Sequence, residues 1–202
     1  MDKRRFLHAT LASIALPGAA LAAPAKASPR AQAAGPALLT LSGALAHPNR
    51  GPLDPALDQL MYKHGVQFER ARSFTYADLA ALPAVEIRPT LEYDAKAHRL
   101  RGPLLTRLLD IAGAPGRSPQ ATVGLRALDG YNVELSLAEL QRRALIVATH
   151  LDGMPLPLGG LGPLWAVFDP AQLPELAARP LSERFAQCPW GLYSIHVGEA
   201  AG

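Results

Sequence analysis

The chain has 202 residues, 49% of them hydrophobic and 18% charged, which is enough for one well-cored domain. Removing residues 1–22 takes away three of the 20 basic and one of the 17 acidic residues. The 17 basic and 16 acidic residues that remain offer no basic surface for nucleic acid. The single cysteine, Cys188, excludes an internal disulfide and a thiolate zinc cluster, and we expect a small buried apolar side chain there.

Residues 1–22 have the pattern of an export signal. Basic residues near the start precede an apolar stretch, and Ala20-Leu21-Ala22 offers a small-x-small cleavage site. Proline and glycine interrupt the apolar stretch, which is too short for a stable membrane span. The basic pair followed by Phe-Leu also resembles a twin-arginine signal, so the general secretory and twin-arginine routes both remain open. Either route predicts a periplasmic protein. Residues 23–36 have no apolar periodicity and are expected to form a disordered leader.

Two segments in the first half of the domain have strand patterns. Ala37–Gly43 is a short apolar run that ends at glycine, and residues 85–88 alternate before Pro89. Residues 57–62 are apolar but too short to distinguish a helix from a loop. Residues 89–103 are expected to form a polar loop. The 19 prolines and the aromatic content of 6% favour a loop-rich α+β or β domain over a helical bundle.

Two segments in the same half have helix signals. Thr75 is a suitable N-cap with Asp78 three residues later, and Pro83 predicts that this short helix has ended before it. Residues 104–112 carry leucines at helical spacing, and Gly113 stands where a left-handed C-cap residue is expected.

Residues 122–169 contain the clearest strand patterns. Apolar residues alternate over 123–127 and 131–135, and Asp129-Gly130 between them predicts a tight hairpin turn. Ser136 with Glu139 forms a capping box, which predicts a short helix to about residue 143. Further apolar runs are expected strands: residues 145–149, 164–168 and 192–197. The sequence therefore predicts an α+β domain over residues 37–199.

The motifs of this domain follow one another in a characteristic order: R-x-R-G-x-L-L-x-x-L-L-x-x-A-G (99–113), D-G-Y (129–131), L-I-V-A-T-x-x-D-G-x-P-L (145–156), G-P-L-W-x-V (162–167) and W-x-L-x-x-I (190–195). Their order resembles that of the oxidoreductase molybdopterin-binding domain, the core of the sulfite oxidase family. The chain looks most like small exported bacterial proteins that consist of that domain alone. The resemblance implies a mixed β core with short helices, and binding of molybdopterin or a related ligand.

Several residues depart from the family pattern. In catalytic members, a cysteine thiolate binds the molybdenum, and this cysteine follows the strand that here ends at residue 88. Thr90 is the best match to the position of that cysteine. A neutral hydroxyl is a poor ligand for such a metal centre. Leu161 stands where those members have a histidine, and Pro189 replaces a basic residue beside Trp190 that helps to hold the cofactor phosphate. Four arginines are either phosphate ligands or solvated side chains: Arg88, Arg99, Arg101 and Arg126.

Five residues are candidates to bind a cofactor or related ligand: Thr90, Arg126, Tyr131, His150 and Trp190. Tyr131 belongs to the D-G-Y motif, and His150 follows a predicted strand, where site residues collect. Trp165 and Trp190 are most simply core aromatics, although the resemblance places Trp190 near the cleft. No residue is assigned as catalytic or as a metal ligand.

Two functional hypotheses follow. The first is an exported molybdopterin-dependent-oxidoreductase-like protein that binds molybdopterin or a related small molecule and has a periplasmic redox partner, with redox activity in doubt because the metal cysteine is absent. The second is a cofactor-free periplasmic binding or accessory module on the same fold. Neither involves nucleic acid, and neither predicts a membrane span once the signal is removed.

Overall fold

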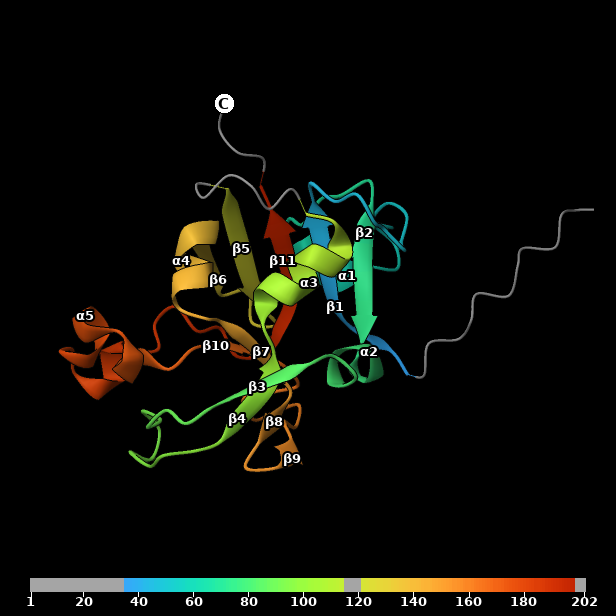
Figure 1. Cartoon of the computed structure of the whole chain (residues 1–202). Helices are drawn as coiled ribbons and strands as arrows, with labels where there is room; N and C mark the ends of the chain where they lie inside the picture. Colours follow the sequence, from blue (N-terminus) through green and yellow to red (C-terminus); the bar gives the residue numbers. More distant parts are fainter. Residues whose placement is uncertain (1–34, 115–120, 199–202) are drawn as a thin grey trace, which may run out of the picture. The chain divides into compact units, whose positions relative to one another are not determined.

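The computed structural model describes residues 35–114 and 121–198 (Figure 1). The predicted export signal, all but the last two residues of the predicted leader, and the final residue of the predicted domain lie outside the described residues. Within the described ranges, no helix is long and apolar enough to cross a membrane.

The largest sheet of the described chain has five strands in the order β2-β1-β11-β5-β6. Their bounds are β1 Ala37–Gly43, β2 Ala71–Thr75, β5 Thr122–Ala127, β6 Asn132–Ser136 and β11 Leu192–Val197. β1 and β11 pair in parallel, so the first and last strands of the domain lie side by side at the centre of the sheet; the other pairs are antiparallel. The predicted strands at β1 and β11 are confirmed, whereas β2 was not predicted.

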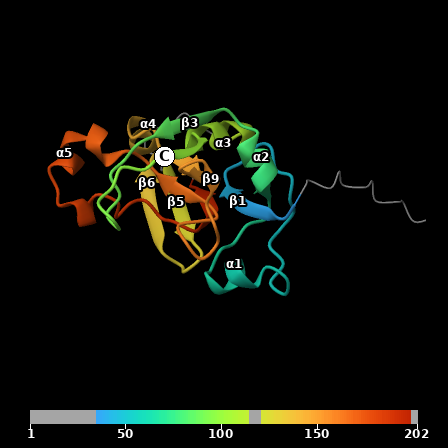
Figure 2. The same ribbon diagram turned by 90° about the horizontal axis from the view of Figure 1, so that it is seen from below.

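The hairpin of β5 and β6 forms where the sequence predicts it (Figure 2). Leu125 pairs with Val133, and the turn between the strands contains Gly130 at φ 91°, a conformation that glycine adopts without steric cost. A carboxylate oxygen of Asp129 accepts a hydrogen bond from the Tyr131 backbone N–H at 2.9 Å. The turn thereby holds Asp129 and Tyr131 at one end of the large sheet.

A second sheet has four antiparallel strands in the order β3-β4-β8-β9 (Figure 1). Their bounds are β3 Ala84–Ile87, β4 Leu100–Pro103, β8 His150–Leu151 and β9 Met154–Pro155. A two-stranded ladder of β7 (Ile146–Ala148) and β10 (Trp165–Val167) completes the sheets. β3, β7 and β10 confirm the expected strands, but the expectation of an uninterrupted polar loop over residues 89–103 is wrong because β4 occupies its end.

A glycine allows β4 to lie against β7. A Cβ atom built on Gly102 would stand 1.9 Å from the carbonyl oxygen of Val147, and no rotation of a side chain removes a clash with backbone. Glycine at position 102 is therefore a packing requirement: any larger residue would push the two strands apart.

Short helices connect the strands: α1 Gln59–Lys63, α2 Tyr76–Ala80, α3 Leu105–Ala112, α4 Leu137–Arg142 and α5 Pro174–Ala177, with 3₁₀ turns η1 Pro170–Gln172 and η2 Leu181–Glu183. Both predicted capping boxes are present, at Thr75 with Asp78 and at Ser136 with Glu139. Gly113 ends α3 at φ 65°, as its position predicts.

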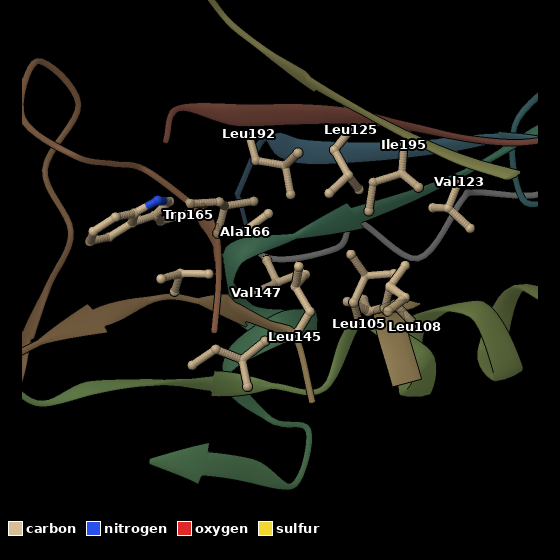
Figure 3. Packing of buried hydrophobic residues seen from close by; sticks show 14 of the residues in the cluster. Leu105, Leu108, Val123, Leu125, Leu145, Val147, Trp165, Ala166, Leu192 and Ile195 are labelled. Atoms are coloured by element: carbon tan, nitrogen blue, oxygen red, sulfur yellow. The ribbon is translucent and has the colours of Figure 1, made fainter. Parts of the chain in front are cut away.

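The hydrophobic core lies between α3, the five-stranded sheet and the β7–β10 ladder (Figure 3). Leu105 and Leu108 of α3 point toward Val123 and Ile195 of the sheet, and all four side chains are fully buried. Trp165 is also fully buried, as predicted for a core aromatic. The core interpretation of Trp190 is wrong: 41% of this residue is exposed.

Candidate functional site

A cleft of about 250 Å³ opens where three connecting segments meet. Glu92 and Tyr93 come from the loop after β3, Asp129 and Tyr131 from the β5–β6 turn, and Trp190 from the segment before β11. The remaining lining residues are Ala127, Phe185, Ala186, Cys188 and Pro189. We call this the aromatic cleft. It brings together the loop after β3, the D-G-Y turn and the segment that contains Trp190.

Backbone pairing explains why Trp190 projects into the cleft while its neighbours are buried. Trp190 forms an isolated bridge with Trp165 of β10, and the Trp165 indole N–H donates to the Cys188 carbonyl oxygen at 2.8 Å. Cys188 is only 3% exposed. Because the segment is fixed to a buried strand at both Cys188 and Trp190, the tryptophan ring is held at the cleft rather than being free on the surface.

Three exposed aromatic residues line the cleft: Tyr93 (56% exposed), Tyr131 (50%) and Trp190 (41%). The Tyr93 hydroxyl interacts with both the Trp190 indole N–H and the Glu92 carboxylate. The Tyr131 hydroxyl donates to the Ala186 carbonyl. Partial burial, followed by the negative charge of Glu92, raises the pKa of Tyr93 above its usual value, so this phenol is neutral at physiological pH.

The charged groups that line the cleft are both acidic. Glu92 and Asp129 contribute carboxylates, and no lysine, arginine or histidine of the described chain is among the lining residues. Arg143 is the cation that acts on the Cys188 thiol, but it is 7% exposed and its guanidinium binds Glu139 at 3.0 Å and Gln187 while stacking over Phe168. The positive charge of Arg143 is therefore paired with Glu139, and Arg143 is not among the residues that line the cleft.

The cleft does not fit a molybdopterin. Burial raises the pKa of Cys188 to about 12, so the only thiol is protonated, and it is enclosed rather than presented to a ligand. Two carboxylates stand where a pterin phosphate would need cations. Among residues 35–114 and 121–198, no group of three or more histidine, cysteine or carboxylate side chains is placed to hold a metal ion.

The structure divides the five candidate residues among different surfaces. Tyr131 and Trp190 line the aromatic cleft. Thr90 is exposed, pairs through its backbone with Ala97 and does not line the cleft. Glu92 and Tyr93, two and three residues further along the same loop, line it instead. The sequence pattern selects Thr90 in this loop and misses both residues, since no local pattern shows which side chains of a loop face a ligand.

Arg126 lies on another face. It lines a groove of about 310 Å³ on the five-stranded sheet, with Glu134, Ser194 and His196 among its neighbours. Successive residues of a strand point to opposite faces, so Arg126 points away from the side that carries the buried Leu125. The alternation of buried and more exposed residues along β5 already predicts that Arg126 and Leu125 lie on opposite faces.

His150 lies in a third place, a pocket of about 240 Å³ on the second sheet that we call the arginine pocket. Its lining residues are Glu86, Arg99, Arg101, His150 and Gly153. The ring of His150 is held between the Tyr76 hydroxyl (Nε2, 3.1 Å) and the Thr149 hydroxyl (Nδ1, 2.8 Å). Burial and then the nearby Arg101 charge lower the pKa of His150, so the imidazole is neutral at pH 7.

The fold is that of a mixed α and β domain, in which sheets joined by short helices enclose one core. No protein-family model matches the sequence, and no curated protein is significantly similar to it. Among solved structures, the sulfane dehydrogenase SoxCD from Paracoccus pantotrophus resembles it with a TM-score of 0.51 and 11% sequence identity. The similarity covers 79% of this chain and 37% of the SoxCD chain, and at this identity it is a distant likeness of fold.

Proposed function

We propose that this protein is an exported small-molecule-binding module on a sulfite-oxidase-like fold, and that it works without molybdopterin. The observation that carries the proposal is the lining of the aromatic cleft: four aromatic residues, three of them exposed, and two carboxylates, with a protonated buried thiol and no cation among the described lining residues. The cleft contains Trp190 and part of the loop after β3, which the family resemblance implies lie near a ligand, and a cavity of this kind suits a small molecule.

The alternative is a molybdopterin-dependent oxidoreductase-like protein with a periplasmic redox partner. The order of the sequence motifs and the likeness of fold to a sulfane dehydrogenase favour it. The arginines that the sequence offers for a cofactor phosphate do not line the cleft. Arg88 is paired with Glu86 at 3.1 Å, Arg99 and Arg101 line the arginine pocket, and Arg126 lines the groove on the large sheet.

A metal and pterin assay separates the two. The full chain is produced in molybdenum-replete cells together with a known molybdopterin protein as a positive control, and both are assayed for molybdenum and for released pterin. We expect neither in this protein. Stoichiometric molybdenum and pterin would overturn the proposal.

Ligand binding is measured by tryptophan fluorescence. The chain has two tryptophans, of which Trp165 is fully buried and Trp190 lines the cleft. We expect ligands to change the emission of the wild type but not that of Trp190→Phe, in which only Trp165 emits.

Periplasmic location is also part of the proposal and rests on the N-terminal sequence pattern. Cell fractionation should find the protein in the periplasm. If it uses the twin-arginine route, Arg4→Lys together with Arg5→Lys abolishes export, whereas unchanged export assigns the general secretory route. A protein that stays in the cytoplasm would contradict the location.

A further inference from the structure

We propose that the ligand of the aromatic cleft is a small organic cation, such as a quaternary or protonated amine. The inference rests on the cleft being a ligand site, as proposed above. It is carried by three exposed aromatic side chains and two carboxylates around one cavity of about 250 Å³. Aromatic ring faces and carboxylates both attract positive charge, and together they form the usual recognition site for ammonium groups.

The polar edges of the three aromatic residues are already bonded. The Tyr131 hydroxyl donates to the Ala186 carbonyl oxygen, and the Tyr93 hydroxyl interacts with the Trp190 indole and the Glu92 carboxylate. What these side chains offer a ligand is therefore ring surface more than hydrogen-bonding capacity. The same bonds restrain the rings before a ligand arrives, which lowers the entropic cost of binding.

The two carboxylates lack a competing cation. Across the described residues, neither Glu92 nor Asp129 forms an ion pair with lysine, arginine or histidine. Asp129 accepts the Tyr131 backbone N–H, which fixes its position without neutralising its charge. An anionic ligand would meet two like charges in this cleft, whereas a cation would meet two opposite ones.

Tyr93 is also compatible with a cationic ligand, because its side chain carries no positive charge. Its hydroxyl stays neutral, since burial and the Glu92 charge raise its pKa, and it links the indole to the carboxylate. A ligand with an alkylated ammonium, which needs no hydrogen-bond acceptor, suits the bonded aromatic edges best. The arginine pocket differs from the aromatic cleft in charge, because Arg99 and Arg101 line it.

An isosteric pair of ligands tests the charge directly. Choline and 3,3-dimethyl-1-butanol have nearly the same shape, but only choline is charged. We expect choline to bind the full chain and quench Trp190, and the neutral analogue to bind at least about tenfold more weakly by calorimetry. Acetate and sulfate should not compete, and added salt should weaken choline binding.

Variants locate the site. Glu92→Gln, Asp129→Asn and Tyr93→Leu should each weaken choline binding about tenfold, while each variant keeps the circular dichroism and melting curve of a folded protein. Glu134→Gln is the matched carboxylate control, because Glu134 lines the groove on the other face of the five-stranded sheet. Tyr62→Leu is the aromatic control, since Tyr62 is exposed on α1, away from the cleft lining.

Each outcome decides one of the two proposals. Equal affinity for choline and its neutral analogue, quenching by anions alone, or no response to either ligand would overturn the cation inference. Equal losses in Glu134→Gln and Glu92→Gln would also overturn it. None of these results tests the proposal that the protein works without molybdopterin. The molybdenum and pterin assay tests that proposal separately.

Discussion

The aromatic cleft and the arginine pocket are nearly equal in volume, about 250 and 240 Å³, but opposite in chemistry. The cleft presents carboxylates and aromatic rings, whereas the pocket presents two arginines, a histidine and one glutamate. They also differ in construction. The cleft is assembled by three connecting segments, and the pocket by strand register: Glu86 pairs with Arg101, and Arg101 with His150, across β3, β4 and β8.

This difference shows that the charge of each site depends on whether loops or paired strands carry its ionisable residues. The R-x-R-G motif is present, but its arginines lie on the second sheet, where the pairing of β4 places them. The segments that line the cleft are free to vary, because a loop residue changes without moving a strand. A cleft can thus change its charge while the sheets around it persist.

The reactivity of Cys188 gives the largest expected effect and tests whether the cleft can present a thiolate. A pKa of about 12, against an ordinary 9.0, lowers the thiolate fraction about a thousandfold. We expect the folded protein to react with Ellman's reagent at pH 8 about a thousand times more slowly than the same protein in denaturant. Fast stoichiometric labelling of the folded chain would show an accessible thiolate and reopen metal binding in the cleft.

Gly102→Ala should be the most destabilising single substitution on the arginine-pocket side. The added Cβ meets the Val147 carbonyl oxygen and forces β4 from β7, so we expect a loss of about 3 kcal/mol in the free energy of unfolding, measured with urea. Gly124→Ala is the control. The nearest atom to its Cβ, on His196, lies 3.8 Å away, and that variant should unfold like the wild type. Equal stabilities would contradict the close approach of β4 and β7.

The β5–β6 hairpin and strand β4 differ in how far the sequence predicts them. The β5–β6 hairpin and both capping boxes depend on residues a few positions apart, so local rules predict them. β4 contains Gly102 and Pro103, which locally indicate a loop, and it is a strand because it pairs with β3 and β8, segments distant in the sequence. Short-range patterns cannot show such pairing.

The site follows the same rule. Tyr131 and Trp190 were candidates because they belong to the D-G-Y and terminal tryptophan motifs of the family resemblance, and both line the cleft. Glu92 and Tyr93 were not candidates, since their contribution to the cleft depends on how a long loop meets the β5–β6 turn. Arg126 was a candidate for its charge, although the alternation of β5 already places it on the face opposite Leu125.

Acid dependence of stability should arise beside the arginine pocket. His98 binds Asp152 at 2.7 Å and Asp94 at 3.0 Å; these bonds raise the pKa of His98 and lower the pKa of both carboxyls. The histidine contribution is complete below its unfolded pKa near 6.5 and is lost as pH rises through the folded value. The carboxylate contribution is present above their unfolded pKa near 4 and is lost as pH falls through the folded values.

His98→Gln should therefore destabilise the protein most between about pH 4.5 and 6 and much less at pH 8.5, measured by urea unfolding at each pH. The effect should be smaller than that of Gly102→Ala, since solvent screens these pairs: the side chains of Asp94 and Asp152 are 39% and 52% exposed. In a background with Asp94→Asn and Asp152→Asn, the pH dependence of the His98 substitution should vanish. A loss that stays constant from pH 5 to 8.5 would contradict the ion pairs.

The smallest expected effect tests whether the two sites are independent. Burial is the larger cause of the low pKa of His150, and the Arg101 charge is the second. Arg101→Gln should raise the His150 pKa while leaving it below 6.5, because burial persists; the measurement is an NMR titration of the ring protons. Glu92→Gln, which changes the charge of the aromatic cleft by one unit, should leave the His150 pKa unchanged. If Glu92→Gln moves it as far as Arg101→Gln does, the cleft and the pocket share one electrostatic environment, and their opposite charges cannot select ligands separately.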